Sequence, residues 1–206
     1  MYARSTTIHA NTSSLDQGIA HVRDVVLPAL QNTDGFMGLS MLVDRNSGRC
    51  IATSSWQSRD AMRASEHQVR PVRERASQML GGTPHVEEWQ IAVVHRDHRS
   101  HPGACVRASW LQVEPAQLER AIDIYKMVSL PSIEDLDGFC SASLLVNHAT
   151  GTTVSSVAYD SNDAMQANRD QATFIRTAGT DDARAQVVEV CEFELALAHL
   201  RVPELA

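Results

Sequence analysis

The chain has 206 residues, of which 43% are hydrophobic and 21% are charged, a balance typical of a globular protein. Its formal net charge is -7, and the 18 Lys and Arg residues are scattered along the chain. This charge argues against nucleic acid and anionic membrane surfaces as partners, because both are bound through a basic face.

The chain begins with a predicted strand, a long helix and a hairpin. Residues 2–10 are β-branched or apolar, as in a short strand. Residues 14–32 follow, with apolar positions at helical spacing: Leu15, Ile19, Val22, Val26 and Leu30. Residues 36–43 and 49–56 are then predicted to form two strands around a turn in which Gly48 supplies a positive φ.

A second helix and a fourth strand complete this first unit. Ser58 is suited to cap the helix, and Asp60 places a negative charge in its first turn. The inward-facing stripe of the helix follows the helical period: Met62, Ser65, Val69, Val72 and Ala76. The fourth strand is predicted over residues 86–94, and the polar residues 97–103 form a linker that ends in Pro-Gly.

The rest of the chain repeats these elements at a shift of 103 residues. Residues 34–36 and 137–139 both read Asp-Gly-Phe, and residues 60–62 and 163–165 both read Asp-Ala-Met. Turn glycines match as well as apolar positions, so the similarity indicates an internal duplication. After a one-residue indel the shift becomes 104. The first strand has its equivalent at residues 104–113, and the turn at residues 147–151. Ser161 is the equivalent of the N-cap, and residues 188–198 are the equivalent of the fourth strand.

Each unit has the element order β-α-β-β-α-β. A single such unit leaves one apolar face of its sheet uncovered, and a second unit supplies the cover. We therefore predict an α+β fold in which two tandem ferredoxin-like units, residues 1–96 and 104–206, form a dimeric α/β-barrel-like structure within one chain.

The end of the third strand carries the same short motif in both units. Residues 56–62 read Trp-Gln-Ser-Arg-Asp-Ala-Met, and residues 159–165 read Tyr-Asp-Ser-Asn-Asp-Ala-Met. In this motif the chain resembles the antibiotic-biosynthesis-monooxygenase-like (ABM-like) family of dimeric α/β barrels, in its uncharacterised tandem-domain actinobacterial form. The resemblance implies a cavity between the sheet and the helices of each unit, beside the aromatic residue.

The chain departs from the catalytic members of that family at two places. Those members typically carry a His nine residues after the aromatic, where it acts on a substrate or binds haem iron, but this chain has Ser65 and Asn168 there. The haem-degrading and cofactor-free members also use an Asn on the first strand. At the matching positions this chain has other residues: Arg4, Thr6, Arg107 and Ser109.

Six residues are candidates for ligand binding, three in each unit: Trp56, Ser65 and Arg4, and Tyr159, Asn168 and Arg107. The aromatic rings could stack on a planar ligand or simply pack at a strand end. The polar side chains on the inward stripe need a hydrogen-bond partner from a ligand, a water or a backbone carbonyl. The arginines could bind an acidic or enolate ligand, but we expect them to form ion pairs with Glu88 and Glu192.

The remaining chemistry-bearing residues predict no further site. His67 lies about 200° round the helix from the inward stripe and should face solvent unless Pro71 kinks the helix. His95, His98 and His101 could gather a transition metal, but a solvated linker is expected. The cysteines lack metal-site spacing, so we expect reduced, buried thiols and neither a metal nor a cofactor: Cys50, Cys105, Cys140 and Cys191.

Two functions are compatible with these residues. The first is a non-catalytic protein that binds a small hydrophobic or aromatic ligand or serves as a stress-associated scaffold. The alternative is a cofactor-independent monooxygenase for a small enolisable aromatic, although it lacks a positioned base. We expect a cytoplasmic protein, because residues 1–16 lack the apolar run of a signal peptide; further homo-oligomerisation stays open. Because Phe174 can fill space, we expect the first-half cavity to be the larger and Trp56 to contribute more than Tyr159.

Overall fold

The computed structural model describes residues 1–205, and these divide into two compact units. Unit 1 comprises Met1–Trp89 and Glu194–Val202. Unit 2 comprises Gln90–Phe193 and the described residues from Pro203 onward. The last strand of each repeat therefore begins in one unit and ends in the other. The predicted division at residues 97–103 does not include this exchange.

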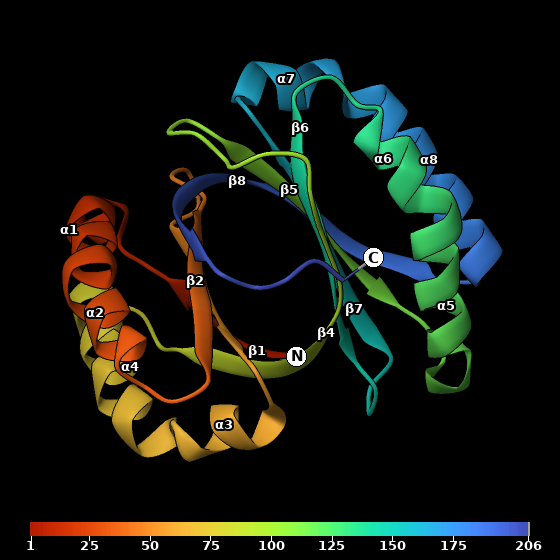
Figure 1. Cartoon of the computed structure of the whole chain (residues 1–206). Helices are drawn as coiled ribbons and strands as arrows, with labels where there is room; N and C mark the ends of the chain where they lie inside the picture. The colour runs from red at the N-terminus through yellow and green to blue at the C-terminus, as the bar shows by residue number, and fades with distance from the viewer. Residues whose placement is uncertain (206) are drawn as a thin grey trace. The chain divides into compact units, whose positions relative to one another are not determined.

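Unit 1 has the predicted order of elements (Figure 1). They are β1 (Tyr2–His9), α1 (Leu15–His21), α2 (Leu27–Gln31), β2 (Phe36–Val43), β3 (Arg49–Trp56), α3 (Arg59–Ala64), α4 (Glu66–Leu80) and β4 (His85–Arg96). A π-helical turn over Val22–Val26 joins α1 to α2, so that the predicted long helix is continuous but locally widened. Strand β3 lies between β1 and β2 and pairs antiparallel with both.

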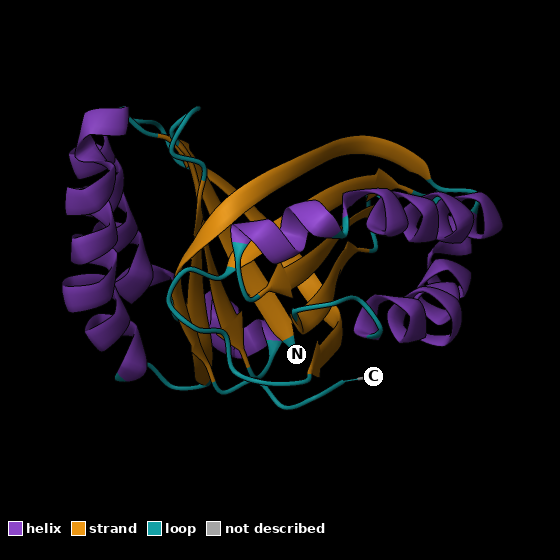
Figure 2. Cartoon of the chain, turned by 90° about the horizontal axis from the view of Figure 1, so that it is seen from above, coloured by secondary structure: helices purple, strands orange, loops and turns teal. Residues whose placement is uncertain are grey.

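Unit 2 repeats this order, which confirms the duplication. Its elements are β5 (Cys105–Gln112), α5 (Leu118–Ile124), α6 (Leu130–Glu134), β6 (Phe139–Asn147), β7 (Thr152–Tyr159), α7 (Asn162–Ala167), α8 (Arg169–Ala183) and β8 (Gln186–Leu200). The π-helical turn also recurs, over Tyr125–Ser129. In each unit the helices lie along one face of the strands (Figure 2).

The strand order confirms the predicted α+β fold. Hydrogen-bonded neighbours follow the sequence β1-β3-β2-β8-β5-β7-β6-β4, and this order closes on itself as a barrel. Strand β2 pairs with Glu194–Leu200 at the end of β8, and β6 pairs with Gln90–Arg96 at the end of β4. The first of these pairings lies within unit 1 and the second within unit 2.

The turn and capping residues behave as their chemistry predicts. The Ser58 and Ser161 hydroxyls each accept a hydrogen bond at 3.1 Å from the backbone three residues on, which caps α3 and α7. Gly48 and Gly151 both have φ of +74°, the left-handed value that their turns require.

The second helix of each unit is broken, in contrast to the single helix predicted. The breaks fall at Ser65, between α3 and α4, and at Asn168, between α7 and α8. The Ser65 hydroxyl donates to the Met62 carbonyl at 2.7 Å, and the Asn168 amide donates to the Ala164 carbonyl at 2.7 Å. Short polar side chains compete in this way with the helical backbone bonds.

Each unit has its own hydrophobic core, in which Met62 and Trp56 are buried in unit 1 and Met165 and Tyr159 in unit 2. The thiols of Cys50 and Cys140 are buried as expected. Two other cysteines are only partly buried, because they lie at the start of β5 and after the exposed first part of β8: Cys105 and Cys191. In residues 1–205 no helix combines the length and the apolar character needed to span a membrane.

Candidate functional site

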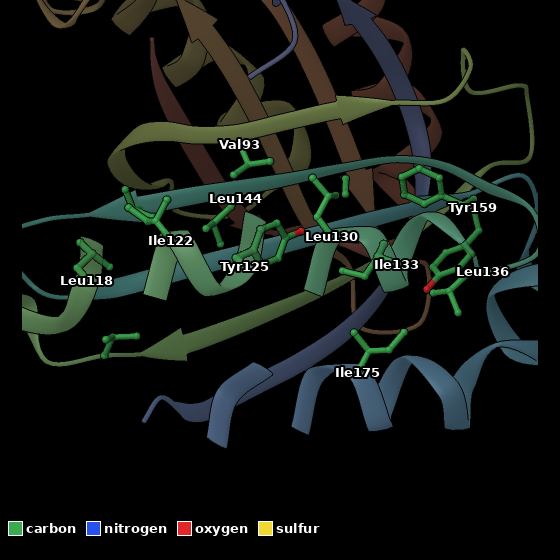
Figure 3. Close-up of a cluster of buried hydrophobic side chains, with 14 of the residues drawn as sticks. Val93, Leu118, Ile122, Tyr125, Leu130, Ile133, Leu136, Leu144, Tyr159 and Ile175 are labelled. Atoms are coloured by element: carbon green, nitrogen blue, oxygen red, sulfur yellow. The ribbon is translucent and has the colours of Figure 1, made fainter. Parts of the chain in front are cut away.

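Unit 2 contains a cavity between its helices and strands β5, β6 and β7, with a volume of about 80 Å³. Figure 3 shows the side chains of this region on α5, α6 and α8 and on the strands beside them. Most side chains around the cavity are apolar and include Leu111, Ile122, Ile133, Leu144, Val157 and Ile175. Four larger polar side chains also line it: Arg107, Tyr125, Tyr159 and Arg176. An apolar cavity with few polar groups is typical of a small-molecule site.

A wider hollow of about 400 Å³ adjoins this cavity. Its lining is mostly charged or polar: Arg107, Arg169, Thr173, Arg176, Val190 and Glu192. Arg107 and Arg176 line both spaces, so they stand between the apolar cavity and its charged mouth.

The matching cavity in unit 1 is smaller, about 60 Å³. The prediction that the first-half cavity is the larger is therefore wrong. It was based on Phe174, which was expected to fill the second cavity, but that side chain is 74% exposed. Phe174 lies on α8 next to the buried Ile175 and so points away from the inward stripe.

The inner faces of α4 and α8 differ in side-chain volume at two positions beside the cavities. Where α4 carries Val69 and Leu80, α8 carries Ala172 and Ala183 at the same positions of the repeat. Leu80 also packs against a glycine of α1: a Cβ placed on Gly18 would lie 2.2 Å from the Leu80 side chain. The smaller residues of α8 leave space that the side chains of α4 occupy in unit 1.

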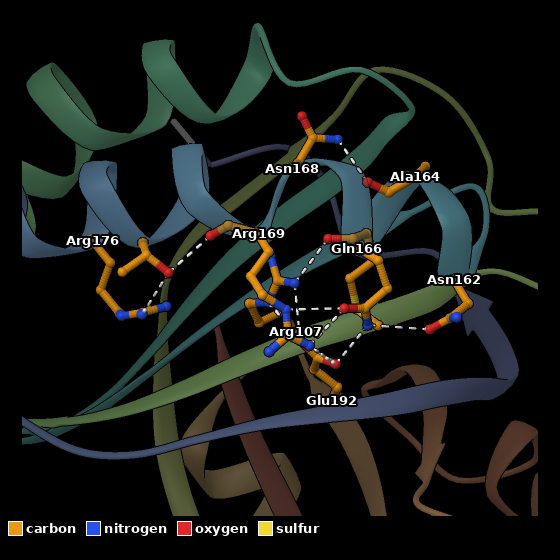
Figure 4. A network of polar contacts seen from close by, with 10 residues as sticks. Arg107, Asn162, Ala164, Gln166, Asn168, Arg169, Arg176 and Glu192 are labelled. Carbon is orange, nitrogen blue, oxygen red and sulfur yellow. Dashed lines mark hydrogen bonds and ion pairs between the residues drawn. The ribbon is translucent and has the colours of Figure 1, made fainter.

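Arg107 is the centre of a polar network at the mouth of the unit 2 cavity (Figure 4). Its guanidinium donates to Glu192 at 2.9 Å and to the backbone carbonyl of Met165 at 2.8 Å. Gln166 and Arg169 also donate to Glu192, at 2.8 and 3.1 Å. Burial opposes ionisation of this carboxyl, but the hydrogen bonds from Gln166 and Arg107 outweigh it and lower the pKa of Glu192.

Arg4 occupies the same place in unit 1 and is also buried. It forms ion pairs with Glu88 at 3.2 Å and with Glu66 at 2.9 Å. Glu66 in turn binds Arg73 at 2.7 Å. The predicted ion pairs of Arg4 with Glu88 and of its counterpart on β5 with Glu192 are therefore confirmed.

The two cavity tyrosines of unit 2 differ in their hydrogen bonding. The Tyr125 hydroxyl contacts the Ser155 hydroxyl at 3.2 Å, and burial raises the pKa of Tyr125 to about 12. The Tyr159 hydroxyl is buried and forms no hydrogen bond of good geometry in residues 1–205, although it interacts with the Arg107 guanidinium, whose carbon lies 5.8 Å from the ring centroid. Burial raises the pKa of Tyr159 against the opposing effect of Arg107. Both tyrosines are therefore neutral phenols near pH 7.

The remaining candidates from the sequence lie in the core beside the cavities and do not line them. Trp56 donates to the Ser54 hydroxyl at 3.0 Å and meets Phe36 edge-on at 5.6 Å. Ser65 is satisfied by its backbone bond, and Asn168 donates to two backbone carbonyls, those of Asp137 and Ala164. The role of these three residues in ligand binding stays a prediction, and each already has a hydrogen-bond partner within its unit.

The histidines outside the cavities differ from one another. His67 is exposed, as its helical position predicts. His98 is hydrogen-bonded to Asp97 at 2.8 Å and to Asp160 at 2.9 Å. Both bonds raise the pKa of His98, and the bond to Asp160 has the larger effect. One ligand atom of His98, one of His101 and one of Asp160 lie within 4.8 Å of one another. The expected solvated linker is thus tied to unit 2 by an ion-pair cluster.

Two proteins of Mycobacterium tuberculosis H37Rv share the whole length of this chain. Rv2557 is 59% identical over 205 residues, which are 100% of this chain and 92% of Rv2557. Rv2558 is 59% identical over 206 residues, which are 100% of this chain and 87% of Rv2558. The chain belongs to the Rv2557/Rv2558 family. Both of these relatives are described as uncharacterised, and no protein-family model matches the chain.

The ABM-like fold of this chain is shared by several solved structures. A Lactobacillus acidophilus protein provisionally assigned as a monooxygenase has a TM-score of 0.72 at 10% identity, covering 97% of this chain and 96% of its own. An anthrone oxidase-like protein has a TM-score of 0.67 at 14% identity, with coverage of 98% and 91%. At these identities the likeness concerns the fold, so function has to be argued from the site.

Proposed function

We propose that this protein binds one small, largely apolar ligand in the unit 2 cavity and does so without catalysis. The observation that carries the proposal is the difference between the two inner helix faces, which leaves more space in unit 2 beside Ala183 than in unit 1 beside Leu80. Benzene fills an apolar cavity of about 150 Å³. A ring in the unit 2 cavity of about 80 Å³ therefore has to extend toward the mouth at Arg176.

The lining side chains favour binding over the monooxygenase alternative. An oxygenase acting on an enolisable aromatic has to remove a proton from its substrate, which requires a positioned base. Among the described residues that line the cavity there is no His, Asp or Glu. The two phenols cannot serve near pH 7, because burial raises the pKa of both Tyr125 and Tyr159.

Benzyl alcohol, a small neutral probe, tests this proposal by titration of the ¹⁵N-labelled chain in an NMR experiment. We expect saturable shifts at one site per chain. The variant Ala121→Gly/Ala183→Leu transfers the Gly18–Leu80 pair of unit 1 to the equivalent positions of unit 2 and should abolish binding. The reverse variant Gly18→Ala/Leu80→Ala should retain the unit 2 site.

Two results would contradict the proposal. One is the absence of saturable binding to the natural chain. The other is unchanged binding to Ala121→Gly/Ala183→Leu when circular dichroism and thermal melting show that the variant is folded.

A further inference from the structure

Two buried hydrogen-bond donors beside the unit 2 cavity lack partners. Arg107 is 5% exposed, and its Nη1 atom makes no hydrogen bond within residues 1–205, although the rest of the guanidinium is fully engaged. Tyr159 is 0% exposed, and its hydroxyl interacts with the Arg107 guanidinium without forming a hydrogen bond of good geometry. Leaving two buried donors unpaired is unfavourable, and an acceptor bound in the cavity would relieve it.

The charge around the cavity differs between the two units. In unit 1, Glu66 binds both Arg4 and Arg73. The equivalent position in unit 2 is Arg169, so that a cation replaces the shared anion. The mouth of the unit 2 cavity therefore holds three arginines around a single carboxylate: Arg107, Arg169 and Arg176 around Glu192.

Arg176 is the arginine of the three whose charge Glu192 does not neutralise, because Glu192 is paired with the other two. It donates a hydrogen bond to the Thr173 hydroxyl at 3.2 Å, whereas its unit 1 counterpart Arg73 is ion-paired to Glu66 at 2.7 Å. Burial and the neighbouring charge of Arg107 together lower the pKa of Arg176. A bound anion would offset both effects, because it stabilises the charged forms of the two guanidiniums.

We propose that the ligand of unit 2 is a small apolar carboxylate, with its ring or chain in the cavity and its anionic group held by Arg107, Arg176 and the Tyr159 hydroxyl. This inference rests on the proposed function and adds the chemical class of the ligand. A carboxylate has the two oxygens needed to accept from both guanidinium groups and from the phenol, which stays protonated in its buried position. Unit 1, in which Glu66 already pairs both cations, should not bind it.

The test compares benzoate with benzamide, which has nearly the same shape and no charge, by NMR titration at low salt. We expect benzoate to bind about tenfold more tightly, because its hydrogen bonds are charge-assisted. Arg176→Gln should remove most of that difference, while Arg73→Gln, at the same position of the repeat in unit 1, should leave it in place. Tyr159→Phe should weaken benzoate binding, because it removes one of the donors to the carboxylate.

The outcomes separate this inference from the proposed function. If benzyl alcohol binds but benzoate binds no more tightly than benzamide, or if Arg176→Gln retains the full preference, anion recognition is wrong and the apolar site stands. If neither benzyl alcohol nor benzoate binds, both are wrong.

Discussion

Removal of the Tyr159 hydroxyl should stabilise this protein, although Tyr159 is one of its most deeply buried side chains. The hydroxyl is buried, and within the described residues it interacts with the Arg107 guanidinium without forming a hydrogen bond of good geometry. An unsatisfied buried polar group costs about 1–3 kcal/mol, whereas the ring and its contact with Arg107 persist in the Phe variant. We therefore expect Tyr159→Phe to raise the free energy of unfolding by about 1 kcal/mol, which corresponds to a rise in Tm of about 2–4 °C for a chain of this size.

Tyr125→Phe is the matched control, because Tyr125 lines the same cavity but its hydroxyl has a partner. The bond to Ser155 at 3.2 Å would be lost and the Ser155 hydroxyl left with one contact fewer, at a cost of about 0.5–1.5 kcal/mol. Scanning calorimetry of both ligand-free variants should thus show shifts of opposite sign. If Tyr159→Phe lowers Tm as much as Tyr125→Phe does, the Tyr159 hydroxyl has a partner after all, and the argument from unpaired donors is refuted.

Three further predictions concern positions outside the cavity. Arg184→Gly should stabilise the chain by about 0.5–1 kcal/mol, because Arg184 ends α8 at φ of +52° where α4 ends in Gly81; equal or lower Tm would contradict this. His98→Ala should lower Tm more at pH 5.5 than at pH 9. Because folding raises the pKa of His98, its contribution to stability is complete below the pKa of the unfolded chain, about 6.5. That contribution is lost as the pH rises through the pKa of the folded protein. His85→Ala is the control for this variant, and a pH-independent difference would show that His98 makes no ion pair. Titration with haemin should produce no stoichiometric Soret shift. Where catalytic ABM-like proteins typically carry a His, this chain has side chains that are already hydrogen-bonded to the backbone: Ser65 and Asn168.

The parts of the fold that could be predicted from the sequence are those set by short local motifs that occur in both units. Ser58 and Ser161 each precede an acidic first turn and cap a helix, and the turn glycines have the positive φ expected of them. The arginine and glutamate that match in both units proved to be ion partners, because neighbouring strands bring matched positions together. Agreement between two copies made each of these inferences stronger than it would be from one.

The helix breaks and the relative cavity sizes could not be predicted in the same way. The apolar stripe continues through Ser65, so its period gave no sign that the hydroxyl would bond to the preceding turn and end the helix there. The size of Phe174 suggests that it fills space, but its position on the helix, next to the buried Ile175, directs its side chain away from the inward stripe. The signal that could have ranked the cavities was the loss of side-chain volume along the inner face of α8, at Ala172 and Ala183.

The central claim, that unit 2 and not unit 1 holds the ligand site, is tested most directly by methyl NMR of the natural chain titrated with benzyl alcohol. Methyl groups that line the unit 2 cavity, those of Ile122, Leu144 and Ile175, should shift together along one saturable curve. Methyl groups at the equivalent cavity of unit 1, those of Leu30, Leu39 and Val69, should not move. Equal shifts in both sets, or saturable shifts in the unit 1 set alone, would contradict the account.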